Sequence, residues 1–297
     1  MKKVIVTIFR WQKHSSFSSI FENFIKYCSF CIIDILKTLT NISFSLKNIP
    51  AFNHMKLFQE IENFPSVDHF VQNPESISLF WQIAQKNINK KKDKKILFLK
   101  THNAQINFKS FNFTEKDLTR AFIYVVRDPR SVLLSSFSHY GHEDYNETLK
   151  VIMSDQRYSY AVKSNNRLPE FLLSWRSNFI SWHNFGQKNQ DLGLIVKYED
   201  MVLNPETTFL KVLTFLEKKI KVKFNNDKFQ NSIRSINFKH IQQIENKIGF
   251  FERSKNSKKF FRSGKINEWQ KKLNSETIKI IKKKLKKEMN YLGYYEE

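Results

Sequence analysis

Three side chains that could bind an anion or move a proton lie at the ends of apolar runs. Arg127 closes the run AFIYVVR (121–127), and Ser135 follows eight positions later. His102 closes a second run, KILFLKTH (95–102). A guanidinium at a strand end and a hydroxyl on the next helix can bind one phosphate together, and a histidine titrates near neutral pH. The residue types alone equally allow an arginine paired with a carboxylate, a solvent-facing serine and a core histidine.

The residues after Arg127 predict how a strand gives way to a helix. Asp128 suits the N-cap, and Pro129 suits the first helical position, where no backbone N–H is needed. We therefore expect Arg127 to be the last strand residue, with Ser135 two turns into the helix on roughly the face of Ser131. In open parallel sheets, ligands bind beyond the carboxyl ends of the strands, which is where this arginine would lie.

The order of elements predicts an α/β fold. Apolar runs rich in β-branched residues indicate buried strands, and segments with helical spacing separate them. The expected strands are 2–9, 95–102, 121–127 and 192–200, and the expected helices are 15–39, 131–140, 168–185 and several from 205–216 onward. Such alternation is typical of a mostly parallel sheet with helices on both faces. We expect one domain over residues 1–297 with a helical C-terminal third.

The chain of 297 residues is strongly basic, with a net charge of +22. This charge favours anionic partners, which include nucleic acid, acidic lipid headgroups and sulfated or phosphorylated substrates. Lysine-rich runs at 86–95 and 278–292 are also what an AT-rich genome would produce. The second run predicts an amphipathic C-terminal helix packed on the body with solvated lysines. A membrane-surface or RNA-binding role for that helix stays open as an alternative.

The two cysteines and the apolar content of the N-terminal region predict no special compartment. Cys28 and Cys31 form a lone C-x-x-C in an apolar helical stretch, and no second cysteine or histidine pair completes a metal site, so we expect core residues and no bound metal. The apolar stretch 27–36 is interrupted by Asp34 and is too short to span a membrane. The first residues do not resemble a signal peptide. These observations predict a cytoplasmic protein.

Five segments, in order along the chain, together resemble the motifs of the cytosolic-type sulfotransferases, which have a P-loop-like three-layer fold. YVVRDPRSVLLSSFSHY (124–140) resembles the 3′-phosphate motif, in which an arginine is followed eight residues later by a serine. The other four are FLKTH (98–102), VKYEDM (196–201), SINFKHI (235–241) and FFRSGKINEW (260–269). The resemblance covers about residues 95–270.

The resemblance implies transfer of a sulfuryl group from the donor PAPS (3′-phosphoadenosine 5′-phosphosulfate), leaving the product PAP (3′-phosphoadenosine 5′-phosphate). The acceptor would be a hydroxyl or amine of a small molecule, lipid or glycan, with no metal and no specific nucleic acid involved. His102 falls on the catalytic base. The remaining matched positions would bind the nucleotide: Arg127 and Ser135 the 3′-phosphate, Tyr198 the adenine, Phe238 the adenosine, and Arg262, Ser263 and Gly264 the loop that closes over the 3′-phosphate.

The loop after the first strand departs from the family pattern. The family reads close to Pro-Lys-Ser-Gly-Thr-Thr-Trp there, whereas this chain reads RWQKHSSFSSIF (10–21). With one residue deleted, Lys13 can be set against the catalytic lysine, and Ser15, Ser16 and Phe17 against the hydroxyl and aromatic positions. The missing glycine matters because backbone amides must approach the 5′-phosphosulfate closely. A diverged working loop, a decayed inactive relative and a reading-frame slip all account for this departure.

Three classes of function therefore follow. The first is a PAPS-dependent sulfotransferase with His102 as general base. The second is a catalytically impaired relative that binds adenosine 3′,5′-bisphosphate or a polyanion without transferring sulfate. The third is a basic nucleic-acid or membrane-surface protein, which rests on charge alone and lacks a helix-turn-helix, zinc-finger or RNA-binding signature. A phosphate-loop kinase is disfavoured because the Walker pattern is absent.

Overall fold

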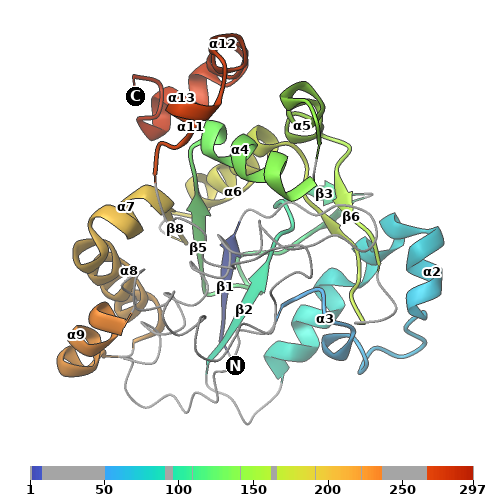
Figure 1. Ribbon diagram of the computed structural model, residues 1–297. Helices are drawn as coiled ribbons and strands as arrows, with labels where there is room; N and C mark the ends of the chain where they lie inside the picture. Colours follow the sequence, from blue (N-terminus) through green and yellow to red (C-terminus); the bar gives the residue numbers. More distant parts are fainter. Residues whose placement is uncertain are drawn as a thin grey trace, which may run out of the picture.

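The structure is a computed structural model that describes residues 2–8, 51–90, 96–108, 110–140, 142–161, 166–190, 192–221, 223–235 and 266–296 (Figure 1). Four strands form its central sheet in the order β2-β1-β5-β8. They are β1 (Lys2–Ile8), β2 (Ile96–Thr101), β5 (Ala121–Val126) and β8 (Gly193–Lys197). The predicted α/β fold with a parallel sheet is confirmed, and each of the four expected strands is present.

All strand pairs of this sheet are parallel. Lys2 pairs with Ile96 in the β1–β2 register, and Val4 pairs with Ala121 between β1 and β5. Strand β5 pairs on its other side with β8, where Val126 lies opposite Lys197. Parallel pairing brings the carboxyl ends of β2, β5 and β8 to one edge of the sheet, so the segments that follow them can share one site.

Strand β5 is buried along its whole length, as its continuous apolar sequence predicts. Helix α6 (Trp175–Lys188) covers one face of it. The Phe122 ring lies 4.9 Å from the Trp182 ring, and the Tyr124 hydroxyl donates a hydrogen bond of 3.0 Å to Asn178 Oδ1. Because alternate residues of a strand face the same side, Phe122 and Tyr124 together fix how α6 packs on the sheet.

Other helices and two small hairpins surround the sheet. In Figure 1, α8 and α9 lie to one side of the sheet and α3 lies to the other. The chain before β5 forms η1 (Met55–Leu57), α2 (Val67–Gln72), η2 (Pro74–Ile77), α3 (Ser78–Lys90) and the hairpin of β3 (Asn107–Phe108) with β4 (Phe111–Asn112). Between β5 and β8 lie α4 (Pro129–Tyr140), α5 (Tyr145–Ile152), the hairpin of β6 (Tyr158–Ser159) with β7 (Glu170–Phe171), and α6.

The C-terminal third is helical in its described part, as predicted. It comprises α7 (Tyr198–Leu203), α8 (Pro205–Ile220), α9 (Asn226–Ser235), α11 (Trp269–Lys272), α12 (Ser275–Lys284) and α13 (Lys286–Leu292). The single helix expected over 278–292 is instead two helices, because Leu285 leaves the helical conformation with φ −113° and ψ 20°. Its apolar face is nevertheless buried, with Ile281 and Met289 fully covered, and α12 packs on α4.

The helix expected over 168–185 is wrong in its first part. Residues Glu170–Phe171 are strand β7, and Leu173 has φ 57°, which a continuous helix does not allow. The helix begins only at Trp175, because the Ser174 side chain accepts a hydrogen bond from the Ser177 amide and caps it. An apolar run without glycine reads as one helix in the sequence, whereas contacts with another segment make its first part extended.

Two strand boundaries also differ from those expected. Strand β5 ends at Val126, so Arg127 is the first residue after the strand and not its last. Strand β8 ends at Lys197, so Tyr198 opens helix α7 and does not lie in a strand over 192–200. Glu199 and Asp200 lie in the first turn of this helix. The helix expected at 15–39, with Cys28 and Cys31, lies outside the described residues.

Candidate functional site

The turn between β5 and α4 is built as the sequence predicts. Asp128 stands at the N-cap of α4, where its Oδ1 accepts a 2.8 Å hydrogen bond from the Arg130 amide, and Pro129 is the first helical residue. The same carboxylate forms an ion pair of 2.5 Å with the Arg130 guanidinium, and both side chains are fully buried. The Arg130 guanidinium also lies 3.6 Å from the centre of the Trp269 ring. A buried charged pair directly after Arg127 therefore fixes the turn that carries this arginine.

Arg127 lies beside Tyr198 at the carboxyl edge of the sheet. Its guanidinium carbon is 4.6 Å from the centre of the Tyr198 ring, a cation–π distance that joins the ends of β5 and β8. Its backbone carbonyl accepts a 3.1 Å hydrogen bond from the Trp175 indole at the start of α6. Tyr198 itself is buried, whereas Arg127 is half-buried. The structure thus brings together two residues that the resemblance assigns to the same nucleotide.

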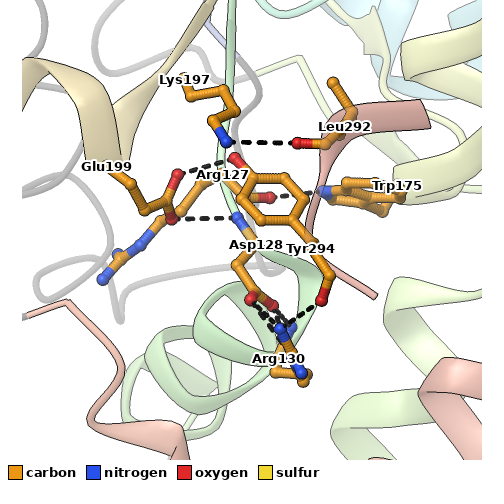
Figure 2. A network of polar contacts seen from close by, with 8 residues as sticks. All are labelled: Arg127, Asp128, Arg130, Trp175, Lys197, Glu199, Leu292 and Tyr294. Atoms are coloured by element: carbon orange, nitrogen blue, oxygen red, sulfur yellow. Dashed lines mark hydrogen bonds and ion pairs between the residues drawn. The ribbon is translucent and has the colours of Figure 1, made fainter. Parts of the chain in front are cut away.

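A buried network continues from this turn to the end of α13 (Figure 2). Glu199 Oε1 accepts a 3.1 Å hydrogen bond from the Asp128 amide, and Glu199 Oε2 accepts one of 2.7 Å from the Tyr294 hydroxyl. Burial raises the pKa of Glu199, while the Tyr294 hydrogen bond and the Arg127 charge partly oppose that rise. Burial likewise raises the pKa of Tyr294, so its hydroxyl keeps its proton and stays a donor at neutral pH.

Two cations hold the backbone of that C-terminal segment. Arg130 Nη2 donates a 2.7 Å hydrogen bond to the Tyr294 carbonyl, and Lys197 Nζ donates one of 3.2 Å to the Leu292 carbonyl. The Lys197 ammonium also lies 5.0 Å from the centre of the Tyr294 ring. Figure 2 shows the Tyr294 ring between Lys197 and Arg130, with Glu199 beside it. Neither Glu199 nor Tyr294 belongs to the residues that the sequence singles out as a site.

His102 lies at the same edge of the sheet, directly after β2. Its backbone amide donates a 2.8 Å hydrogen bond to Glu170 Oε1, and its carbonyl accepts one of 3.3 Å from Asn178 Nδ2. The other oxygen of Glu170 accepts a 3.0 Å hydrogen bond from Nδ2 of the Asn53 side chain. The His102 side chain is only 2% exposed, so an acceptor hydroxyl would have to enter the protein to reach it. The backbone around the imidazole is fixed from both sides.

The remaining predicted positions fall into two groups. Ser135 lies within α4 and is half-buried, in the helix whose N-terminus adjoins Arg127. The others lie outside the described residues: Lys13, Ser15, Ser16, Phe17, Phe238, Arg262, Ser263 and Gly264. The described part of the candidate site therefore consists of the edge of the sheet with His102, Arg127 and Tyr198, together with Ser135 on the adjoining helix.

Comparison with known proteins identifies the family and the fold. The model of the sulfotransferase domain family matches residues 34–293, which is most of the chain. The chain therefore belongs to the sulfotransferase domain family. No curated protein sequence matches it.

Solved structures resemble it in fold. Mouse sulfotransferase SULT7A1, solved in complex with PAP, has 13% identity and a TM-score of 0.58, covering 97% of this chain and 85% of that one. Retinol dehydratase, solved in complex with androsterone and the inactive cofactor PAP, has 15% identity and a TM-score of 0.55, covering 97% of this chain and 81% of that one. At these identities the similarity shows a shared fold.

Among the described residues, no helix is long and apolar enough to cross a membrane. Within the same residues, no group of three or more histidine, cysteine, aspartate or glutamate side chains is placed to hold a metal ion.

Sequence reasoning missed Glu199 and Tyr294, and the two differ in what could have revealed them. Glu199 directly follows Tyr198 in the matched segment VKYEDM, so an acidic residue at the site edge was visible in the sequence. Tyr294 had a weaker signal, namely Gly293 just after an amphipathic helix. Gly293 has φ 71°, the conformation of a helix-ending glycine that turns the chain back. Where the returning chain would lie could not be read from the sequence.

Proposed function

We propose that this chain transfers a sulfuryl group from PAPS to a hydroxyl or amine of a small-molecule, lipid or glycan acceptor. The observation that carries this proposal is the position of Arg127. Its guanidinium lies against Tyr198 at the carboxyl edge of a parallel sheet, and its backbone precedes the first residue of α4 by two positions. A fixed guanidinium favours a phosphate group at that point. Membership of the sulfotransferase domain family supports the same assignment.

The described residues fit the adenosine 3′-phosphate half of such a nucleotide. Arg127 supplies the charge for the 3′-phosphate, and Ser135, on the adjoining helix, supplies a hydroxyl donor. The resemblance assigns the adenine to Tyr198, whose ring lies beside the Arg127 guanidinium. From the sequence resemblance, Phe238 and the 262–264 loop complete this half, whereas Lys13, Ser15, Ser16 and Phe17 would hold the 5′-phosphosulfate.

His102 is assigned the proton transfer. A neutral hydroxyl is a poor nucleophile, so a base within hydrogen-bond reach must take its proton as it attacks. An imidazole titrates in the right range for this task. The His102 amide donates to Glu170, and the His102 carbonyl accepts from Asn178, so the backbone that carries the ring is fixed. The donor supplies the sulfuryl group and a good leaving group.

A second candidate is a relative that binds the nucleotide but transfers sulfate poorly or not at all. The observation in its favour is the sequence of residues 10–17, which lacks the proline and glycine of the family loop. A poorly fixed sulfate end would slow transfer, because about 1 Å of misplacement can cost on the order of a hundredfold in rate. Measurable PAP binding together with no sulfuryl transfer to a panel of phenols, alcohols and amines would favour this candidate.

Calorimetric titration tests the shared part of both candidates. PAP should bind the wild-type chain more tightly than adenosine 5′-phosphate, which lacks the 3′-phosphate. Arg127→Ala should weaken PAP by roughly ten- to hundredfold, the loss of a charge-assisted contact worth about 1.5–3 kcal/mol, and leave adenosine 5′-phosphate nearly unchanged. Equal weakening of both nucleotides would show that Arg127 does not bind the 3′-phosphate.

Arg120 offers a matched control on the same strand. It directly precedes β5, at the end opposite Arg127, and its Nε donates a hydrogen bond to the Lys219 carbonyl. Arg120→Ala removes the same unit of positive charge from the protein. It should leave PAP affinity within about twofold, because the charge lies at the far edge of the sheet. If only general attraction between a basic protein and a nucleotide were at work, Arg120→Ala and Arg127→Ala would lower the PAP affinity equally.

A further inference from the structure

The end of helix α13 turns back into the protein toward the candidate nucleotide site. Gly293 adopts φ 71°, and the Tyr294 amide donates a 2.8 Å hydrogen bond to the Met289 carbonyl, the backbone pattern of a Schellman cap. This cap directs Tyr294 inward, where it is 0% exposed. We name the segment Leu292–Tyr294 the C-terminal clasp. Its two ends are bound by Lys197, the last residue of β8, and by Arg130, in the first turn of the helix that follows β5.

The Tyr294 side chain is linked to Arg127 through two hydrogen bonds. Its hydroxyl donates to one oxygen of Glu199, at 2.7 Å, and the other oxygen of Glu199 accepts from the Asp128 amide, at 3.1 Å. The Asp128 N–H belongs to the peptide group that joins Arg127 to Asp128. The clasp therefore holds, through one buried carboxylate, the peptide unit that sets the direction of the Arg127 side chain.

The same carboxylate lies close enough to Arg127 for the two charges to interact. The Arg127 charge opposes the rise that burial causes in the pKa of Glu199. A carboxylate beside a phosphate-binding arginine competes with the phosphate for that arginine, and it also repels the phosphate. Hydrogen bonds from Tyr294 and from the Asp128 amide hold both oxygens of Glu199, so the carboxylate is kept in one orientation and part of its charge is neutralised.

We propose that Tyr294, acting through Glu199, is a positioning residue for the 3′-phosphate arginine, so that the C-terminal clasp sets the selectivity of the site for a nucleotide with a 3′-phosphate. This inference rests on the proposed function. Tyr294 touches neither nucleotide nor acceptor in this assignment. Its effect reaches the ligand only through the orientation of the Arg127 guanidinium and the strength with which that group attracts a phosphate.

The test is the ratio of the dissociation constants of PAP and adenosine 5′-phosphate, measured by calorimetry on the full chain. Tyr294→Phe keeps the ring and removes only the hydroxyl. It should weaken PAP about three- to tenfold and leave adenosine 5′-phosphate within about twofold, because a misdirected guanidinium loses part of one charge-assisted contact. A general loss of folding would weaken both nucleotides, so the ratio separates positioning from stability.

Tyr295→Phe is the matched control. Tyr295 is the next residue along the chain, and the charged groups found near its ring are Lys282 and Lys286, at 5.2 Å and 5.7 Å. This variant also loses one phenol hydroxyl and should leave the ratio unchanged. Glu199→Gln provides a second variant, because it alters the carboxylate and keeps the tyrosine, and it should change the ratio as well.

The outcomes separate the inference from the proposed function. A wild-type chain that does not prefer PAP overturns the proposed function, and this inference with it. If the wild-type chain prefers PAP and the ratio is unchanged in Tyr294→Phe, the result overturns only the role proposed for the clasp. The same applies if Tyr295→Phe raises the ratio as much as Tyr294→Phe does.

Discussion

The buried pair of Asp128 and Arg130 predicts a large and specific loss of stability when one partner is removed. Both side chains have 0% exposure, and Arg130 also binds the Tyr294 carbonyl and lies over the Trp269 ring. Arg130→Met keeps most of the side-chain volume but leaves the Asp128 carboxylate buried without its cation. Such a change costs about 3–5 kcal/mol. For a chain of this size, that lowers Tm by roughly 6–20 °C.

The double variant Asp128→Asn/Arg130→Met should recover much of this loss. Asparagine still caps the helix, as the Asp128 side chain does now, but it carries no charge that needs a partner. Urea denaturation of the wild type, the two single variants and the double variant gives the coupling energy, which should be at least about 1.5 kcal/mol. Raising the salt concentration should change it little, because buried pairs are weakly screened.

An exposed pair in the same region serves as the control. Lys272 and Glu268 lie 3.8 Å apart, and the lysine side chain is 43% exposed. Lys272→Met should change stability by no more than about 0.5 kcal/mol, as is usual for solvated pairs. An Arg130→Met variant that costs no more stability than this control would contradict the prediction, and so would a double variant that loses as much as the two single variants added together.

Three further predictions concern other parts of the molecule. His102→Ala should reduce sulfuryl transfer about a hundredfold or more and leave PAP affinity within about twofold, and a parallel loss of binding would assign His102 to packing. Because burial raises the pKa of Glu199, its ionised form opposes folding. The wild type should therefore lose stability relative to Glu199→Gln as the pH rises from about 4.3, and a difference in Tm that does not vary with pH would contradict this. Gly193→Ala should cost about 1–3 kcal/mol, since the added Cβ would lie 2.0 Å from the Phe122 ring. In Gly186→Ala the same contact is 3.2 Å, so its Tm should fall much less, and equal losses would argue against this packing.

The sheet and the turn after β5 could be predicted because they depend on local signals. A continuous apolar run such as 121–127 has few alternatives to a buried strand, and an Asp-Pro pair has a strong preference for a helix start. The segment at 168–185 was misread because apolar residues spaced for a helix also fit a short strand followed by a cap. Glu170 decides the outcome by bonding to the His102 amide, a contact 68 residues away in sequence.

The candidate site divides in the same way. The sequence could place Arg127 and Tyr198 near the carboxyl edge of the sheet, because each sits in a short recognisable segment at the end of a predicted strand. Their mutual contact of 4.6 Å depends on β5 and β8 being neighbours, which the sequence alone does not specify. Tyr294 is further removed, since its bond to Glu199 spans 95 residues. No periodicity or motif reports a contact of that kind.

The strand order has a consequence for how the chain folds. The central strand β1 pairs on one side with residues that begin at Ile96 and on the other with residues that begin at Ala121, so both of its neighbours come about ninety residues or more later in the chain. Strand β5 in turn can pair on its other side only when β8 is present, because Phe122 lies opposite Gly193. Every ladder of this sheet closes a long loop, and folding dominated by such non-local pairing is slow. Until the sheet forms, its apolar strands are open to association with other chains. Slower synthesis at low temperature, or chaperones that bind apolar segments, should therefore raise the yield of folded protein.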